Sequence, residues 1–385
     1  MTNRPNDHRG DDGFSLHPAA RRTSPVSEEE KKPAAKTKTK TRKPHRARRI
    51  FLTVLCVILA FILIVAATGV VMYFIGKAHF KNHKIEISAP EEVKILSDDG
   101  SEIEYNNENY VYNDNVVSIL VLGVDRGSLE EEKIVGTNGQ ADAIYLCVLD
   151  TETKDATILG LSRDTMAQVD VYSTGGQYIG LQTMQVCLAY SYGDGKDSSC
   201  ENMKNAVARV LYNIPIHSYV TIDMMAIPKL TDIVGGVTVP EYGEDLMTKT
   251  GNYIDLNEQN ALRYVRERSH ETADANNARM ERQRNFIDAF SKKFIAQTKD
   301  DISTPLSVYN SLNRYDYMVT DVSAAQVTYL AKNFITGVKE VKMLNVPGTS
   351  TVGQEVGEGK NYAEFHVDTD ALYDIILDLF YIKKD

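Results

Sequence analysis

Several features that would place this sequence in familiar classes are scarce or missing. Only four cysteines occur in 385 residues, and their spacing, with no partnered histidine, does not indicate a zinc site. The sequence contains no internal repeat. Residues 1–49 are poor in large apolar side chains and rich in Pro, Lys, Arg, Thr and Asp. Such a segment cannot bury enough surface to fold, so we expect a disordered tail over residues 1–49.

Charge is missing altogether from the stretch Ile50–Gly76. As a helix it would be roughly 40 Å long at about 1.5 Å per residue, enough to cross a hydrocarbon core of about 30 Å. It is too long for the apolar region of a signal peptide, and no convincing cleavage pattern follows it. The sequence therefore predicts one permanent transmembrane helix over residues 50–76.

Acidic residues are missing from Lys31–Arg49, which holds ten lysines and arginines. Such a flank predicts a cytoplasmic N-terminus and an extracytoplasmic C-terminal part; a basic tail for nucleic acid is the alternative. Residues 1–49 carry a net charge of +8, and the remainder of the chain carries −18. An extracytoplasmic part that acidic does not suit nucleic acid.

Beyond the apolar stretch, residues 77–115 are predicted to form a stalk, and residues 116–385 a folded domain. Nearly continuous apolar runs predict buried strands, and apolar residues at helical spacing predict helices between and after them. The expected strands are Val116–Val124, Ala141–Asp150, Ala156–Leu161, His217–Asp223, Val237–Pro240 and Val341–Val346. The expected helices are Ser199–Leu211, Met224–Val234, one after Asn257, Ala278–Ala296, Pro305–Leu312, Ser323–Phe334 and Asp368–Tyr381, with a glycine-rich loop over Gly348–Gly359. Strands alternating with helices indicate the α/β class.

Charged side chains follow or open three of these strands. Asp125 follows the first, Asp142 lies at the entry of the second, and Arg163 with Asp164 follows the third. Two carboxylates from adjacent strands suit Mg²⁺ or Mn²⁺, which take oxygen ligands and share them with substrate phosphates. The alternatives are a turn or capping role for each aspartate and a simple ion pair for Arg163.

Arginines gather further along the chain, at Arg263, Arg266, Arg268, Arg279, Arg282 and Arg284. Arg279, Arg282 and Gln283 stand at i, i+3 and i+4, on one face of a helix. Guanidinium grips phosphate through two parallel hydrogen bonds. A cluster of this kind in an acidic domain indicates a focused anion site. The alternative is a solvated helix face paired with the nearby acids, which are Glu267, Glu271, Asp274, Glu281 and Asp288.

The cysteines leave one question open. Cys56 lies in the apolar stretch, and Cys147 sits in a strand-like run as a small buried apolar residue. Cys187 and Cys200 would both be extracytoplasmic, where disulfides persist, and a short loop separates them. A disulfide between these two is one expectation, and two free thiols are the other.

In this order, five motifs resemble those of the LytR-CpsA-Psr family. They are Leu-Val-Leu-Gly-Val-Asp-Arg (120–126), Ala-Asp-Ala-Ile (141–144), Leu-Gly-Leu-Ser-Arg-Asp-Thr (159–165), the run from Leu256 to Arg268, and Ala-Arg-Met-Glu-Arg-Gln (278–283). The resemblance covers residues 116–296 and leaves 297–385 as a C-terminal extension. It implies an α/β/α sandwich with a central mixed sheet and a groove for a polyprenyl-phosphate lipid.

The family transfers an anionic glycopolymer, of the teichoic acid or capsular type, from polyprenyl pyrophosphate to peptidoglycan. Carried over residue by residue, the resemblance implies that Asp125 and Asp142 hold Mg²⁺ or Mn²⁺ and that Asp164 orients Arg163. The residues that would hold the pyrophosphate are Arg163, Arg266, Arg268, Arg279 and Gln283, with Arg282 beside them.

The sequence departs from the family pattern at Val124 and Ala141, where the family usually has Thr and Ser, and at Gln182–Gln185. These departures concern the metal geometry and the choice of acceptor. The interpretation is a membrane-anchored phosphotransferase of a bacterial envelope. Its alternatives are a polyprenyl-pyrophosphate pyrophosphatase and a non-catalytic lipid-binding or regulatory envelope protein.

Overall fold

The computed structural model describes residues 44–81, 86–125, 135, 139–267, 273–337, 341–354 and 361–384. The chain divides into two compact units, residues 1–59 and 60–385. The described part of the first unit is the beginning of helix α1, which runs over Pro44–Lys81. The predicted disordered tail lies outside the described residues up to residue 43, and its last six residues belong to α1.

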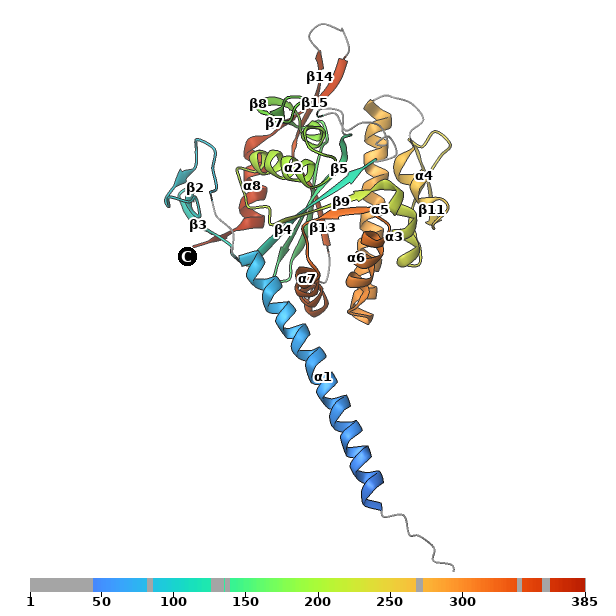
Figure 1. Cartoon of the computed structure of the whole chain (residues 1–385). Coiled ribbons are helices and arrows are strands. Elements are labelled where there is room, and N and C mark those ends of the chain that lie inside the picture. The colour runs from blue at the N-terminus through green and yellow to red at the C-terminus, as the bar shows by residue number, and fades with distance from the viewer. Residues whose placement is uncertain are drawn as a thin grey trace, which may run out of the picture. The chain divides into compact units, whose positions relative to one another are not determined.

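A six-stranded mixed sheet forms the centre of the second unit, in the order β12–β9–β4–β5–β6–β13 (Figure 1). Its strands are β4 (Val116–Val124), β5 (Ala141–Asp150), β6 (Ala156–Leu161), β9 (Ser218–Asp223), β12 (Met318–Thr320) and β13 (Val341–Asn345). β4 runs antiparallel to β5 and parallel to β9, and β6 runs antiparallel to β5 and parallel to β13. The predicted α/β class with a central mixed sheet is confirmed.

The two faces of this sheet are packed differently, because successive side chains of a strand point to opposite sides. Leu120, Leu122, Ile144 and Leu146 are fully buried in one large core with residues of α2 and α8. On the opposite face, the side chains at alternate positions of β4 and β5 are only partly buried. That second face therefore carries an incompletely filled layer.

Helices cover both faces. The first face carries α2 (Asp197–Val210) and α8 (Thr369–Phe380). The second face carries α3 (Ile227–Ile233), α5 (Ala273–Asp300) and α7 (Ala324–Gly337). Two further helices, α4 (Ala261–Arg266) and α6 (Thr304–Arg314), complete the second side. Most predicted helices thus exist within a few residues of their expected bounds, and α5 is longer than predicted.

The folded unit begins earlier than Val116, so the predicted stalk over residues 77–115 is wrong for most of its length. β1 (Lys94–Ile95), β2 (Glu102–Tyr105) and β3 (Glu108–Tyr112) form a sheet with β16 (Tyr381–Lys383) at the other end of the chain. Ile103 of β2 is fully buried in the main core. These strands are short and bury few apolar residues each, so they produce no apolar run that the sequence could signal.

Three hairpins flank the sheet, and the sequence pattern predicted only one of their strands, Val237–Pro240 of β10. They are β7 (Met166–Tyr172) with β8 (Tyr178–Gln185), β10 (Val237–Tyr242) with β11 (Lys249–Leu256), and β14 (Gly348–Gln354) with β15 (Asn361–Val367). β8 and β11 are largely exposed and therefore lack an apolar face. The expected loop over Gly348–Gly359 begins with β14, because hydrogen bonding to β15, not apolar burial, defines that strand.

The predicted membrane-spanning stretch Ile50–Gly76 is helical within α1. Among the residues described, no helix was found to combine the length and apolar character needed to cross a membrane. The span therefore stays a prediction from the sequence.

Candidate functional site

The paired ends of β4 and β5 bring two carboxylates to one edge of the sheet. Asp125 directly follows β4, and Asp142 is the second residue of β5. Val124 pairs with Ala141 and Gly123 pairs with Ala143, so Asp142 is an extra residue on its strand at this point. A bulge of this kind redirects a side chain and is common beside functional sites.

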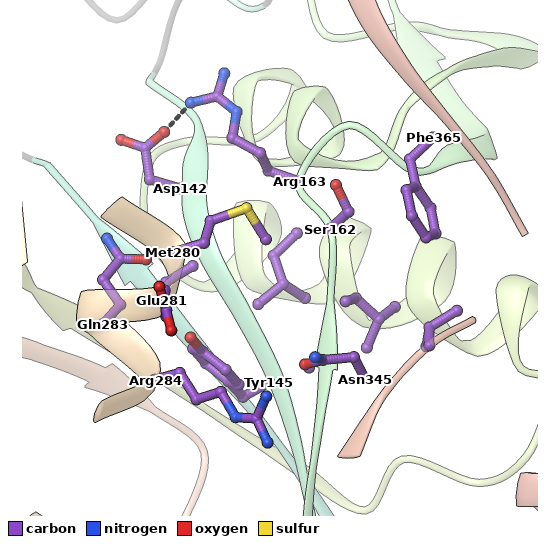
Figure 2. A pocket seen from close by; sticks show the side chains of 15 residues that line it. Asp142, Tyr145, Ser162, Arg163, Met280, Glu281, Gln283, Arg284, Asn345 and Phe365 are labelled. Atoms are coloured by element: carbon purple, nitrogen blue, oxygen red, sulfur yellow. Dashed lines mark hydrogen bonds and ion pairs between the residues drawn. The ribbon is translucent and has the colours of Figure 1, made fainter. Parts of the chain in front are cut away.

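Arg163 meets Asp142 from the end of β6. Its guanidinium forms an ion pair with Asp142 (Figure 2). It also donates a hydrogen bond to Gln140 Oε1. Arg163 Nε lies 3.6 Å from Asp164 Oδ1. Burial raises the pKa of Asp164, while Arg163 and Arg279 oppose that shift. Asp142, Arg163 and Asp164 thus lie together, as their positions at the strand ends predict.

Asp125 forms a second ion pair at the same edge of the sheet. Arg266, the last residue of α4, places Nη2 2.5 Å from Asp125 Oδ2. Each predicted metal carboxylate therefore contacts one predicted phosphate-binding arginine. Arg268 lies outside the described residues.

Helix α5 contributes the remaining predicted residues, and they differ in what they face. Arg279 is 5% exposed and acts electrostatically on Asp164. Gln283 is 6% exposed and donates a 3.1 Å hydrogen bond to the Val265 carbonyl. Arg282 is fully buried and donates to the Glu267 carbonyl, with its guanidinium about 6 Å from two tyrosine rings. The contacts described for Arg282 are thus with the protein itself, and its expected place beside the pyrophosphate stays a prediction.

A polar pocket of about 290 Å³ opens beside the Arg163–Asp142 pair (Figure 2). Its walls come from β5, β6, α5, β13 and β15. The lining residues are Asp142, Ala143, Ile144, Tyr145, Gly160, Leu161, Ser162, Arg163, Met280, Glu281, Gln283, Arg284, Asn345, Val346 and Phe365. A pocket with charged groups and apolar walls can hold a charged ligand without full exposure to water.

An apolar cavity of about 200 Å³ lies between the less filled sheet face and α5. Val121, Cys147 and Ile158 form part of its floor, and Phe286 and Phe290 cover it from α5. Ala143, Tyr145 and Gln283 line both this cavity and the polar pocket. The two spaces therefore adjoin, and one ligand with a polar and an apolar part could occupy both.

The disulfide between Cys187 and Cys200, one of the two expectations, does not form, because neither cysteine takes part in a disulfide. Cys187 lies in the 3₁₀ helix Val186–Tyr192 and donates weakly toward Gln140 Oε1 at 4.0 Å. Cys200 lies in α2, with its Sγ 3.0 Å from Thr221 Oγ1 of β9. The two thiols are buried and have different neighbours, Gln140 for Cys187 and Thr221 for Cys200.

No group of three or more His, Cys, Asp or Glu side chains suited to a metal ion was found in the described ranges. Asp125 and Asp142, the two predicted metal carboxylates, fall short of that number. Mg²⁺ is often held by one or two carboxylates together with substrate phosphates, so this pair fits a metal that arrives with its substrate.

Several lining residues were not predicted from the sequence. Tyr145 lies inside an apolar strand, and Asn345 and Phe365 belong to the C-terminal extension. Only Arg284, one residue after Gln283, carried a signal, as part of the arginine cluster. The others reach the pocket through long-range strand pairing, which a single sequence does not reveal.

The fold and these adjoining cavities define an α/β domain with one apolar cavity and one pocket that carries charged side chains. The chain belongs to the LytR_cpsA_psr family, because the family profile matches residues 72–376. It is similar to the polyisoprenyl-teichoic acid–peptidoglycan teichoic acid transferase TagU of Enterococcus faecalis, at 25% identity over 79% of this chain and 89% of that protein.

Two further comparisons bear on the fold and on the range of relatives. Biofilm regulatory protein A of Streptococcus mutans is 26% identical over 61% of this chain, which spans only 57% of that protein. The crystal structure of protein gbs0355 from Streptococcus agalactiae matches with a TM-score of 0.53 at 22% identity, over 69% of this chain and 86% of that one. The structural match supports the fold alone.

Proposed function

We propose that this protein is a membrane-anchored phosphotransferase that moves an anionic glycopolymer from polyprenyl pyrophosphate to peptidoglycan. The observation that carries the proposal is the adjoining pair of cavities, one apolar and one lined by Arg163 and Asp142. A polyprenyl pyrophosphate has this same division between an apolar chain and an anionic head. The name of the Enterococcus faecalis relative, a teichoic acid transferase, supports this substrate class.

The lipid chain would occupy the cavity under α5. Burial of apolar groups contributes about 0.8 kcal/mol for each CH₂, so even part of an isoprenoid chain would bind there with useful affinity. Gln283, which lines both spaces, then lies where the chain meets its pyrophosphate.

The pyrophosphate would contact Arg163, Arg266 and Arg279, with Arg268 and Gln283 as further contacts. Arg163 and Arg266 are held by Asp142 and Asp125, which orient their guanidiniums before the ligand arrives. Asp164 orients Arg163 from its other side. Preorganised cations are effective because phosphoryl transfer depends mostly on positioning and on charge stabilisation.

Mg²⁺ or Mn²⁺ would share Asp125 and Asp142 with phosphate oxygens. When bound, the metal supplies positive charge for the leaving phosphate. The chain's own residues bind the pyrophosphate and keep the polymer-bearing phosphorus accessible to a peptidoglycan hydroxyl. The hydroxyl oxygen bonds to that phosphorus, the bond to the bridging oxygen breaks, polyprenyl phosphate leaves as an anion, and the hydroxyl proton passes to water.

The proposal places residues 1–49 in the cytoplasm, residues 50–76 across the membrane and the folded domain outside. Its support is the sequence: the uncharged stretch and the basic flank before it. A membrane anchor would hold the catalytic domain beside its lipid substrate.

A regulatory, non-catalytic role is the second candidate, because one relative is named a biofilm regulatory protein. A pyrophosphatase that uses water as acceptor is the third, since the polar pocket is open enough to admit water. Product analysis separates both from the transferase.

Two substitutions test whether Asp125 acts as a metal ligand and Arg279 as a contact of the pyrophosphate. Asp125→Ala removes a metal ligand, so transfer should fall by orders of magnitude while lipid remains bound. Arg279→Ala removes a charge-assisted hydrogen bond of about 1.5–3 kcal/mol, so it should weaken lipid binding about ten- to a hundredfold. Arg279→Lys should restore only part of the affinity, because a point charge does not reproduce the guanidinium fork.

Bound lipid can be measured by mass spectrometry, and transfer by labelled polymer on peptidoglycan. Lys292→Ala, an exposed residue of the same helix paired with Asp288, is the control and should change neither quantity. If Asp125→Ala keeps full, Mg²⁺-dependent transfer, the metal assignment is wrong.

A further inference from the structure

The end of the polar pocket remote from Arg163 has chemistry that the pyrophosphate site does not use. Arg284, Tyr145 and Asn345 lie there, and Figure 2 shows their side chains grouped together, apart from the Arg163–Asp142 pair. Along β5, Asp142 and Tyr145 are three positions apart, so their backbones are about 10 Å apart at 3.4 Å per residue. The two ends of the pocket therefore offer separate places for ligand groups.

Arg284 supplies the cation at this end, where it acts electrostatically on Glu281 and Tyr145 without an ion pair to either. Within the described parts of the chain, its side chain makes no hydrogen bond or ion pair. The neighbouring carboxylate, Glu281, pairs instead with Lys249 at 2.6 Å. The Glu281–Lys249 pair is neutral as a whole, so the charge of Arg284 stays available to an anion.

Asn345 is set in place by the sheet. It ends β13 and pairs in register with Gly160 of β6. A Cβ at Gly160 would lie 2.8 Å from Asn345 Oδ1, so the glycine leaves the space that the amide occupies. The side chain amide offers both a donor and an acceptor.

Tyr145 completes the group from the floor of the pocket. Burial raises the pKa of its hydroxyl to about 12, although Arg284 opposes that shift. The hydroxyl therefore stays protonated at neutral pH and can donate a hydrogen bond. The Arg284 guanidinium and the Asn345 amide supply the donors that recognise an anionic, oxygen-rich group.

We propose that Arg284, Asn345 and Tyr145 form a second anion subsite, which binds an anionic group of the glycopolymer itself while the pyrophosphate is held at the Arg163 end. The inference rests on the proposed function and names the part of the donor that the pocket selects. It also gives the C-terminal extension a role, since Asn345 comes from it. A donor with a neutral polymer would leave Arg284 without a ligand.

The test compares three lipids on the full chain in detergent micelles. They are polyprenyl pyrophosphate, the same lipid carrying a neutral disaccharide, and the same disaccharide bearing one glycerol phosphate. In the wild type, the added phosphate should strengthen binding about tenfold over the neutral disaccharide, as one charge-assisted contact does. In Arg284→Gln, this gain should disappear.

Arg284→Lys should keep part of the gain, because it retains the charge without the fork. Lys292→Gln, on the exposed part of the same helix, should keep all of it. Melting temperatures of the variants establish that each one is folded. The proposal is overturned if the wild type shows no gain or if Arg284→Gln retains it.

The outcomes also separate this inference from the function on which it rests. A wild type that binds all three lipids equally removes the subsite and leaves the pyrophosphate site intact. A wild type that binds none of them removes both.

Discussion

Three arginines within six residues of α5 have different surroundings and therefore different roles. Arg282 is enclosed between Tyr242 and Tyr264 and holds the carbonyl of Glu267, at the end of α4. Burial lowers its pKa, as expected for a cation removed from water. Arg279 acts on Asp164, and Arg284 faces the open pocket. The helical spacing that placed Arg279 and Arg282 on one face does not decide which of them meets a ligand.

Two buried thiols should make the protein sensitive to alkaline pH. Burial raises the pKa of Cys147 to about 12 and that of Cys187 to about 11. In the unfolded chain these thiols lose their protons near pH 8.5–9, so the folded state binds more protons above that pH. The stability that they contribute is complete below about pH 8.5 and is lost as the pH rises toward 11–12.

Melting curves at pH 8 and pH 10.5 measure this loss. Cys147→Ala should show a smaller drop than the wild type, by about 1–2 kcal/mol in the free energy of unfolding at pH 10.5. Tyrosines with raised pKa values contribute equally to both proteins and cancel in the comparison. Equal drops in the two proteins would mean that the Cys147 thiol titrates normally.

The β14–β15 hairpin is attached directly to the turn that carries Arg163. The Phe365 amide donates to the Asp164 carbonyl at 2.8 Å, and Thr165 forms a bridge with Phe365. Gln185 Nε2 donates both to Asp164 Oδ1 at 2.9 Å and to the Ala363 carbonyl at 2.6 Å. An element from the C-terminal extension thus supports the turn at the candidate site.

Gln185→Ala should therefore lower transfer several-fold while changing the melting temperature little, because it removes side-chain contacts at a partly exposed position. Gln185 lies in the β7–β8 hairpin, and the matched control is Gln168→Ala in β7 of that hairpin. The side-chain amide of Gln168 donates to Thr183 Oγ1 at 2.7 Å. That control should retain wild-type transfer. Equal losses in the two variants would show that the hairpin does not position Arg163 through Gln185.

The sequence predicts best the strands that are apolar along their whole length. β4, β5 and β6 have the predicted bounds, because strands inside a covered sheet are apolar along their length. The hairpins at β7–β8 and β14–β15 were missed because exposed strands depend on pairing with a partner. For the candidate site, the positions of Asp142 and Arg163 at strand ends correctly predicted that their side chains meet. The contributions of Tyr145, Asn345 and Phe365 depend on how β13 and β15 fold back, which no local pattern encodes.

At the level of the whole chain, the charge distribution predicts the orientation. The basic residues Lys31–Arg49 precede the uncharged stretch, and the remaining chain is strongly acidic. In a variant without native cysteines, a cysteine at Thr153, an exposed residue of the folded unit, should react with an impermeant maleimide on intact cells. A cysteine at Ser24 in the predicted tail should react only after the cells are opened. Labelling at Ser24 but not at Thr153 in intact cells would contradict the predicted orientation.

The fate of a labelled polymer distinguishes polymer transfer from lipid binding alone. The most direct measurement supplies polyprenyl pyrophosphate carrying a labelled anionic polymer, together with peptidoglycan and Mg²⁺, and follows both products over time. We predict that labelled peptidoglycan and polyprenyl phosphate appear in equal amounts, and that Arg163→Gln abolishes both. Labelled polymer phosphate released into solution, with none on peptidoglycan, would contradict transfer in favour of hydrolysis, and no turnover would leave a lipid-binding protein.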